Sequence, residues 1–369
     1  MLQKLSYHWG LIQGTLFPSL KAKPELSEMT RMHQRLIALV EVVRVEKFIK
    51  SFEECVGRPE SDRCAIARAF IAKTLYKVGE TKSFIEFLRN DYILRRICGW
   101  ENKRDIPSES TFSRAFAEFA ESELATRLHE AFVVEHHGDR LVGEISRDAT
   151  AIEAREKATP KLHEDQVKKE KKKRGRPKKG TPKVEKPKTR LENQVGMNLS
   201  QMLADLPRVC DIGTKKNSKG FKTSWKGYKL HVDTANGDIP ISALLTSAST
   251  HDSQVALPLA HITESRVTYL YELMDAAYDA EVIRDFVASR NHVALIDFNH
   301  RGPKDERCFL PHEAHHYKVR SSAERVNSQL KDNYGGNKVR VRGPEKVMSH
   351  LMFGILALTV EQTLRFLIT

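Results

Sequence analysis

Apolar residues recur three and four positions apart over most of residues 28–137, which is the period of an amphipathic helix. Alternating segments, which would indicate strands, do not interrupt this half of the chain. Ser108 precedes its last long helical stretch, and a serine in that place predicts capping of the first free amides. We therefore predict an all-α N-terminal domain over residues 1–137.

The pattern changes at Leu141, where short segments with alternating or continuous apolar residues begin. These segments predict strands, and they comprise residues 141–146, 227–234, 239–249, 267–274 and 292–299. A tight turn is expected at Gly237, and helical patterns separate the later strands. We therefore predict an α/β domain with a mixed β-sheet over residues 138–369.

The composition narrows the class of protein. Its 40% apolar and 30% charged residues are typical of a globular chain. The longest apolar run, residues 351–360, is too short to cross a bilayer and predicts a buried helix. The N-terminus lacks the pattern of a secretory signal, so we expect no membrane partner and a cytoplasmic location.

The net charge of +13 is concentrated in one segment. Residues 155–190 contain sixteen Lys and Arg against five acidic residues, and they have few apolar side chains. Such a segment cannot bury enough surface to offset its chain entropy. We therefore predict a basic, disordered insertion at about residues 155–222 of the second domain.

Four polar residues in the C-terminal part share one helical face. Tyr317, Arg320, Glu324 and Lys331 fall within an arc of about 60° if each residue turns the helix by about 100°. The apolar residues of the same helix lie on another side, so one face can pack while the polar face borders a cleft. A surface helix with solvated charges is the alternative interpretation.

The spacing of these four residues resembles the YREK signature of insertion-sequence transposases of the IS4 and IS5 type. These are DDE enzymes with a ribonuclease-H-like catalytic core. Residues 147–150 resemble the first aspartate site of the family, and residues 273–279 resemble the second. Residues 83–116 are similar to its helical DNA-binding region. The resemblance covers most of the chain outside the basic segment and implies this fold, with the all-α domain binding DNA.

The resemblance implies that Asp148, Asp275 and Glu324 are catalytic. They would bind two ions of Mg²⁺ or Mn²⁺, since hard cations prefer carboxylate oxygens. Asp148 would bridge both ions, while Asp275 and Glu324 would each bind one. Asp279 is the rival of Asp275, which we prefer because it directly follows a strand that would hold it rigidly.

Further residues are implied to contact DNA. Arg320 and Lys331 would bind phosphates near the scissile bond, and Tyr317 would hydrogen-bond or stack there. Arg174 and Arg176 flank a glycine in a sequence that resembles an AT-hook core. Such a core places arginines in the minor groove. A lysine-rich loop that contains this tetrapeptide by accident is the alternative.

The resemblance implies cut-and-paste transposition by a homodimer on paired DNA ends. The protein would bind the terminal inverted repeats, hydrolyse DNA to expose 3′ hydroxyls and join these to target DNA. Two alternatives stay open: an inactive or domesticated DNA-binding protein, and a metal nuclease without strand transfer. The 49 positions between Asp275 and Glu324 leave no room for the β insertion that some relatives use on DNA hairpins, so a hairpin step stays open.

Overall fold

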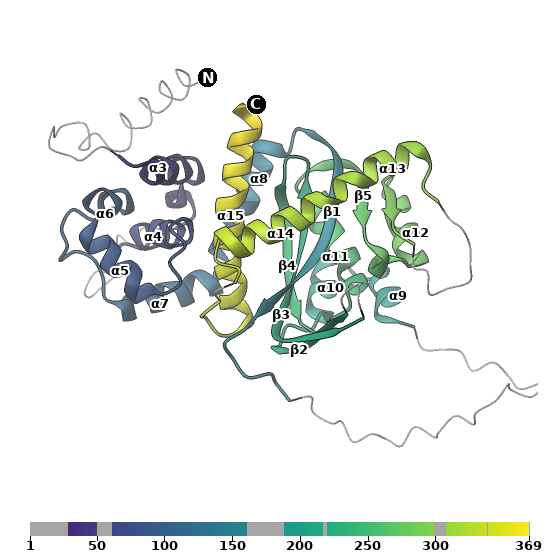
Figure 1. Cartoon of the computed structure of the whole chain (residues 1–369), viewed down its shortest axis with the longest axis horizontal. Coiled ribbons are helices and arrows are strands. Elements are labelled where there is room, and N and C mark those ends of the chain that lie inside the picture. Colours follow the sequence, from purple (N-terminus) through teal and green to yellow (C-terminus); the bar gives the residue numbers. More distant parts are fainter. Residues whose placement is uncertain are drawn as a thin grey trace, which may run out of the picture.

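The computed structural model describes residues 29–49, 61–160, 188–216, 220–298, 308–337 and 339–368. Six helices of the N-terminal half lie beside a mixed sheet that carries further helices (Figure 1). The predicted fold class, an α/β ribonuclease-H-like core after an all-α region, is confirmed.

The N-terminal half is built around one fully surrounded helix. Its elements are α3 (Arg31–Val43), η1 (Val45–Lys47), α4 (Arg63–Leu75), α5 (Thr81–Asn90), α6 (Tyr92–Cys98), α7 (Glu109–Glu121) and α8 (Leu124–His137). Ser108 caps α7 as predicted, because its hydroxyl accepts a hydrogen bond from the amide of Thr111. Helix α4 is buried along most of its length, because its apolar residues are spread around the helix and not confined to one face.

Helix α15 (Pro344–Ile368) joins the two halves and lies between the N-terminal helices and the sheet (Figure 1). The ring of Phe353 stacks on Phe70 of α4 and lies against Phe116 of α7. The helix is long and apolar enough to cross a membrane, but 89% of its apolar window is buried inside the protein. Packing between the two halves therefore accounts for its apolar surface.

The sheet has the order β2–β3–β1–β5–β6, and β4 pairs with β3. The strands are β1 (Leu141–Glu153), β2 (Asp211–Lys216), β3 (Lys222–Ala235), β4 (Ile239–Ser247), β5 (Thr268–Met274) and β6 (Val293–Ile296). Strand β1 is antiparallel to β3 and parallel to β5, so the sheet is mixed. Gly237 lies in the turn between β3 and β4 at φ 83°, a conformation that glycine adopts without strain.

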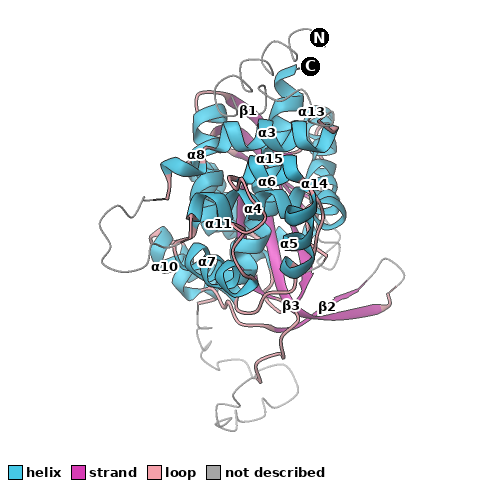
Figure 2. Cartoon of the chain, turned by 90° about the vertical axis from the view of Figure 1, so that its left-hand side faces the viewer, coloured by secondary structure: helices cyan, strands magenta, loops and turns pink. Residues whose placement is uncertain are grey.

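Both faces of the sheet are covered by helices. The remaining elements are η2 (Asp252–Val255), α11 (Ala256–Glu264), η3 (Ala276–Tyr278), α12 (Glu281–Ser289), α13 (Pro311–Tyr317), η4 (Lys318–Arg320) and α14 (Ser321–Asn333). Helices α14 and α15 pack on one side of the sheet, with α14 crossing β1 and β3 (Figure 1). Helix α11 packs on β4, and the ends of β2 and β3 project away from the helices (Figure 2).

The prediction of a disordered insertion as far as residue 222 is wrong for its last part. Residues 188–216 form α9 (Arg190–Gln194), α10 (Leu199–Asp205) and β2. The segment folds because its few apolar residues, such as Leu191 and Met202, are buried against the core that includes Leu257 of α11. Arg174 and Arg176 lie outside the described residues.

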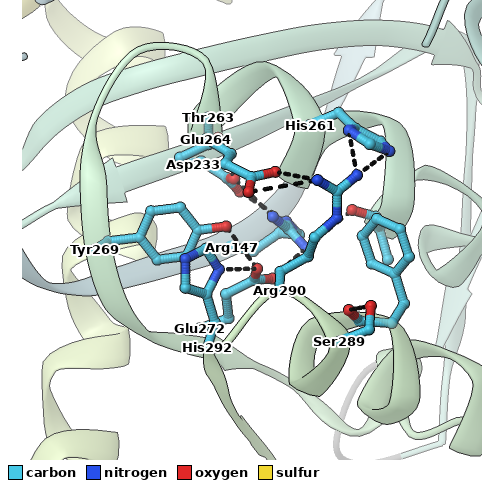
Figure 3. Close-up of polar contacts among 12 residues, drawn as sticks. Arg147, Asp233, His261, Thr263, Glu264, Tyr269, Glu272, Ser289, Arg290 and His292 are labelled. Carbon is cyan, nitrogen blue, oxygen red and sulfur yellow. Dashed lines mark hydrogen bonds and ion pairs between the residues drawn. The ribbon is translucent and has the colours of Figure 1, made fainter. Parts of the chain in front are cut away.

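A buried network of ion pairs ties the three central strands together (Figure 3). Arg147 of β1 donates two hydrogen bonds to Asp233 of β3, at 2.8 and 2.7 Å. It donates another to Glu272 of β5, at 2.9 Å. Thr263 and Tyr269 add hydroxyl donors to the two carboxylates. All three charged side chains are at most 1% exposed, so each depends on the others for the interactions that water would otherwise supply.

Replacing Arg147 by methionine should destabilise the fold by about 3–5 kcal/mol, because two buried carboxylates would lose their cation. Urea unfolding measures the change. Arg104→Met, at an exposed position, is the matched control and should change stability by about 0.5 kcal/mol or less. Equal stabilities of the two variants would contradict the role given to the network.

Candidate active site

Asp148 lies in the middle of β1, and not at the end of a short strand as predicted. The strand continues to Glu153 because β3 pairs with it that far. Its parallel pairing with β5 stops earlier, at Ser146. Asp148 therefore stands just beyond the point where β5 leaves β1. Its Oδ2 atom accepts a hydrogen bond from the side chain of Asn327 on α14, at 2.9 Å.

Asp275 stands directly after β5, at the matching place on the neighbouring strand. Ser146 pairs with Leu273, so two further positions along each strand lead to Asp148 and Asp275. A side-chain oxygen of Asp275 accepts a hydrogen bond from the amide of Ala277, which holds it in the following turn. The backbone thus brings these two carboxylates to the same edge.

The electrostatics agree with this proximity. Burial raises the pKa of Asp148 above its usual range, and the nearby charge of Asp275 raises it further. Burial likewise raises the pKa of Asp275, and the charge of Asp252 acts in the same direction. The folded chain therefore holds negative charge in a place where water compensates it poorly.

The segment predicted to be one helix consists of α13, the short 3-10 turn η4 and α14. Two contacts dock it on the strands: the hydroxyl of Tyr317 donates to the carbonyl of Met274 at 3.1 Å, and that of Ser146 donates to the carbonyl of Val319 at 3.3 Å. Burial raises the pKa of Tyr317 to about 12, so its hydroxyl stays protonated.

The polar face of this segment carries the other predicted residues. The guanidinium of Arg320 forms an ion pair with Glu324, whose side chain is 57% exposed. The charge of Arg320 also favours the ionised forms of Asp148 and Asp275. Lys331 lies farther along α14, within the electrostatic reach of Asp148. The charge of Arg320 thus acts on Glu324, Asp148 and Asp275, whereas Lys331 acts on Asp148 from another part of α14.

Asp279, the rival of Asp275, has a structural partner. Its carboxylate forms an ion pair with Arg284 of α12 at 2.7 Å. Asp275 is the residue whose charge reaches Asp148. The geometry therefore favours Asp275 as the member of the site.

Sequence reasoning missed three neighbours of the carboxylates. Asn327 contacts Asp148 directly, and its place three residues after Glu324 on the same helix was a usable signal. Asp252 follows β4, and Lys215 lies on β2; the charges of both reach Asp275. Only the fold brings these last two residues near the site, since they are distant in sequence.

A divalent metal ion fits this donor set. The two neighbouring carboxylates keep raised pKa values in spite of the charges of Arg320 and Lys215, and the buried amide oxygen of Asn327 has no hydrogen-bond partner among the described residues. Within that same part of the chain, no three Asp, Glu, His or Cys side chains stand close enough together to hold a metal. The carboxylate of Glu324 is paired with Arg320 and does not form such a group with Asp148 and Asp275.

Comparison with protein families adds an independent observation. The family model described as transposase DDE domain matches residues 204–360, and the one described as transposase domain of type DUF772 matches residues 24–118. Comparison with curated proteins gives no match. Asp275 and Glu324 lie inside the first matched region, whereas Asp148 precedes it.

The two matched regions together span more than half of the chain, which belongs to the DDE transposases. The family is one of enzymes that act on DNA in transposition and use divalent metal ions. The chain in which β1, β5 and α14 bring these polar residues together is thus one that matches transposase families.

Replacing Asp148 by asparagine should raise the melting temperature of the metal-free protein. The pKa of this carboxyl is higher in the folded chain than in the unfolded one, so stability falls as the pH rises through that interval. At neutral pH the uncharged side chain of asparagine avoids the loss of stability that comes from ionising Asp148 in the folded chain. Calorimetry at pH 7 without divalent ions measures the difference.

Mn²⁺ should stabilise the wild-type protein, by about 2.7 kcal/mol at one hundred times its dissociation constant. Asp148→Asn should lose most of this response, whereas Asp285→Asn, an exposed aspartate of α12, should keep it. An undiminished Mn²⁺ response in Asp148→Asn would show that the ion binds elsewhere.

Proposed function

We propose that this chain is a cut-and-paste transposase of the IS4 and IS5 type. In this proposal Asp148, Asp275 and Glu324 are its catalytic carboxylates. The observation that carries the proposal is the adjacency of Asp148 and Asp275, at the place where β1 and β5 separate beneath α14. The reaction comprises hydrolysis of DNA at the element ends and joining of the 3′ hydroxyls to target DNA.

Asp148 and Asp275, positioned by β1 and β5, would hold two ions of Mg²⁺ or Mn²⁺ together with Glu324. When bound, such ions lower the pKa of the attacking water or hydroxyl and neutralise the leaving oxygen. The hydrogen bond from Asn327 keeps one oxygen of Asp148 in place and thereby orients the whole carboxylate.

Arg320 and Glu324 provide a means of coupling DNA binding to assembly of the site. Arg320 forms an ion pair with Glu324. A DNA phosphate is a strong competitor for a guanidinium, which it binds in a bidentate manner. Its arrival would take Arg320 and leave Glu324 to complete the carboxylate set. Tyr317, anchored to β5, and Lys331 would hold the same strand.

The other parts of the proposal rest on the family. The helical half would recognise the inverted repeats, and two copies would act on paired ends in the cytoplasm, bound to the nucleoid DNA. The AT-hook role of Arg174 and Arg176 stays a prediction from sequence. A non-catalytic DNA-binding protein is disfavoured by the half-buried, poorly compensated Asp148 and Asp275, because a binding role alone gives no reason to keep them.

Replacing Glu324 by glutamine or Asp275 by asparagine should lower DNA cleavage by at least about 10³-fold, because each change removes a carboxylate ligand. Asp279→Asn is the matched control: it loses an ion pair with Arg284 worth about 1 kcal/mol or less and should keep its activity. The assay is cleavage, with Mn²⁺, of a labelled duplex that ends in the repeats flanking the gene.

Transfer of the cleaved 3′ end to a target plasmid separates a transposase from a simple nuclease. We expect joined products from the wild type and none from Glu324→Gln. Cleavage without joining would support the nuclease alternative, and full activity of either carboxylate variant would refute the assignment of the site.

A further inference from the structure

A cationic pocket of about 250 Å³ lies between the two halves of the chain. Helix α4 and the loop after it supply Lys73 and Lys77, while α14 supplies Lys331 and Asp332. Three lysines thus face one aspartate. The pocket also contains His350 of α15.

Lys73 is the unusual member of this group. Its side chain is 9% exposed, and among the described residues its ammonium forms no ion pair. Burial, together with the charge of Arg340, lowers the pKa of Lys73 to about 8. An unpaired ammonium in such a place costs free energy in the absence of an anion, so its presence calls for a ligand.

The neighbouring groups neutralise this charge only in part, since the charge of Glu80 raises the pKa of Lys73 less than burial and Arg340 lower it. His350 donates through Nε2 to the carbonyl of Gly335, and burial lowers its pKa to about 4, so it is neutral at pH 7. Arg340 is already paired with Glu80 at 2.9 Å. The pocket therefore keeps an excess of positive charge.

The position of the pocket identifies the source of the anion. Lys331 belongs both to the pocket and to the polar face of α14, where it lies within reach of the charge of Asp148. Lys77 is exposed at the rim, so a long ligand can pass from solvent across the opening. Its ammonium is held by the side chain of Asn333 at 2.7 Å. A DNA strand that reaches the carboxylates is a ligand that would contact both the pocket and the polar face of α14.

We propose that this pocket binds a backbone phosphate of the DNA strand that passes the carboxylates, with Lys73 as its innermost contact. The N-terminal half then holds the same strand that Arg320 and Lys331 hold. This inference rests on the proposed function, since it takes DNA as the ligand.

Lys73→Met tests the pocket, because methionine keeps much of the length of the side chain and removes only its charge. Binding to a fluorescent 30-base-pair duplex is measured by anisotropy over a range of NaCl concentrations. The variant should bind about tenfold more weakly at 0.1 M salt, and the slope of log affinity against log salt should fall by about 1. Lys346→Met, at an exposed lysine of α15 outside the pocket, should keep both values within error.

Melting temperatures separate this effect from a folding defect. Lys73→Met should melt at the same temperature as the wild type or higher, because a buried charge is removed. Weaker DNA binding by a more stable variant is a result that a purely structural role of Lys73 would not give.

Three results would overturn the proposal, each in a different way. Unchanged affinity and slope in Lys73→Met would exclude a contact with DNA. Inorganic phosphate that stabilises the wild type but not Lys73→Met, with equal DNA binding by both, would identify a free anion as the ligand. A wild-type protein that neither binds nor cleaves DNA would refute the proposed function itself, and the inference with it.

Discussion

The buried ion network around Arg147 is the constraint on which the candidate site depends. Arg147 and Asp148 are neighbours on β1, so their side chains point to opposite faces of the sheet. On one face Arg147 fastens β1 to β3 and β5 through Asp233 and Glu272. On the other face Asp148 is held relative to β5 by the same anchoring. A hydrophobic residue in place of Arg147 could fill the space, but it would not specify this register through paired charges.

A second feature is the way in which positive charge is distributed around the carboxylates. Among the described residues, Arg320 is the one cation that forms an ion pair with a proposed catalytic residue, Glu324. Lys215 and Lys331 act on the site from a greater distance. In the proposed function, the phosphate of an incoming DNA strand would compete with Glu324 for Arg320. In the N-terminal half, Lys73 is a buried cation without an ion-pair partner among the described residues. We assign it the same kind of role as Arg320, which is to bind a DNA phosphate.

Much of the fold followed from the sequence because its signals are local. A few neighbouring residues are enough to predict the helical period up to residue 137 and the cap at Ser108. The same is true of the strands around Asp148 and Asp275. Strand β2 was missed because its polar sequence resembles the basic segment before it, and only pairing with β3 makes it a strand. The YREK spacing predicted four residues on one helical face; the structure pairs two of them, Arg320 and Glu324, and the turn at η4 interrupts the helix.

The contacts that the sequence could not supply are those between distant elements. Nothing local in Asp233 or Glu272 indicates that one arginine binds both, since they lie on different strands. The same holds for Asp252 and Lys215 near the carboxylates, and for the pocket between α4 and α14. Each of these depends on the order of strands in the sheet or on the docking of α15 between the halves.

The central claim is that Asp148, Asp275 and Glu324 form one metal site when DNA is bound. A crystal structure with Mn²⁺ and a duplex carrying the element end, with the ions located by anomalous scattering, tests it most directly. The account predicts manganese in contact with all three carboxylates, and Arg320 on a DNA phosphate. Manganese bound without Asp148 and Asp275, or Glu324 still paired with Arg320 in the DNA complex, would contradict it.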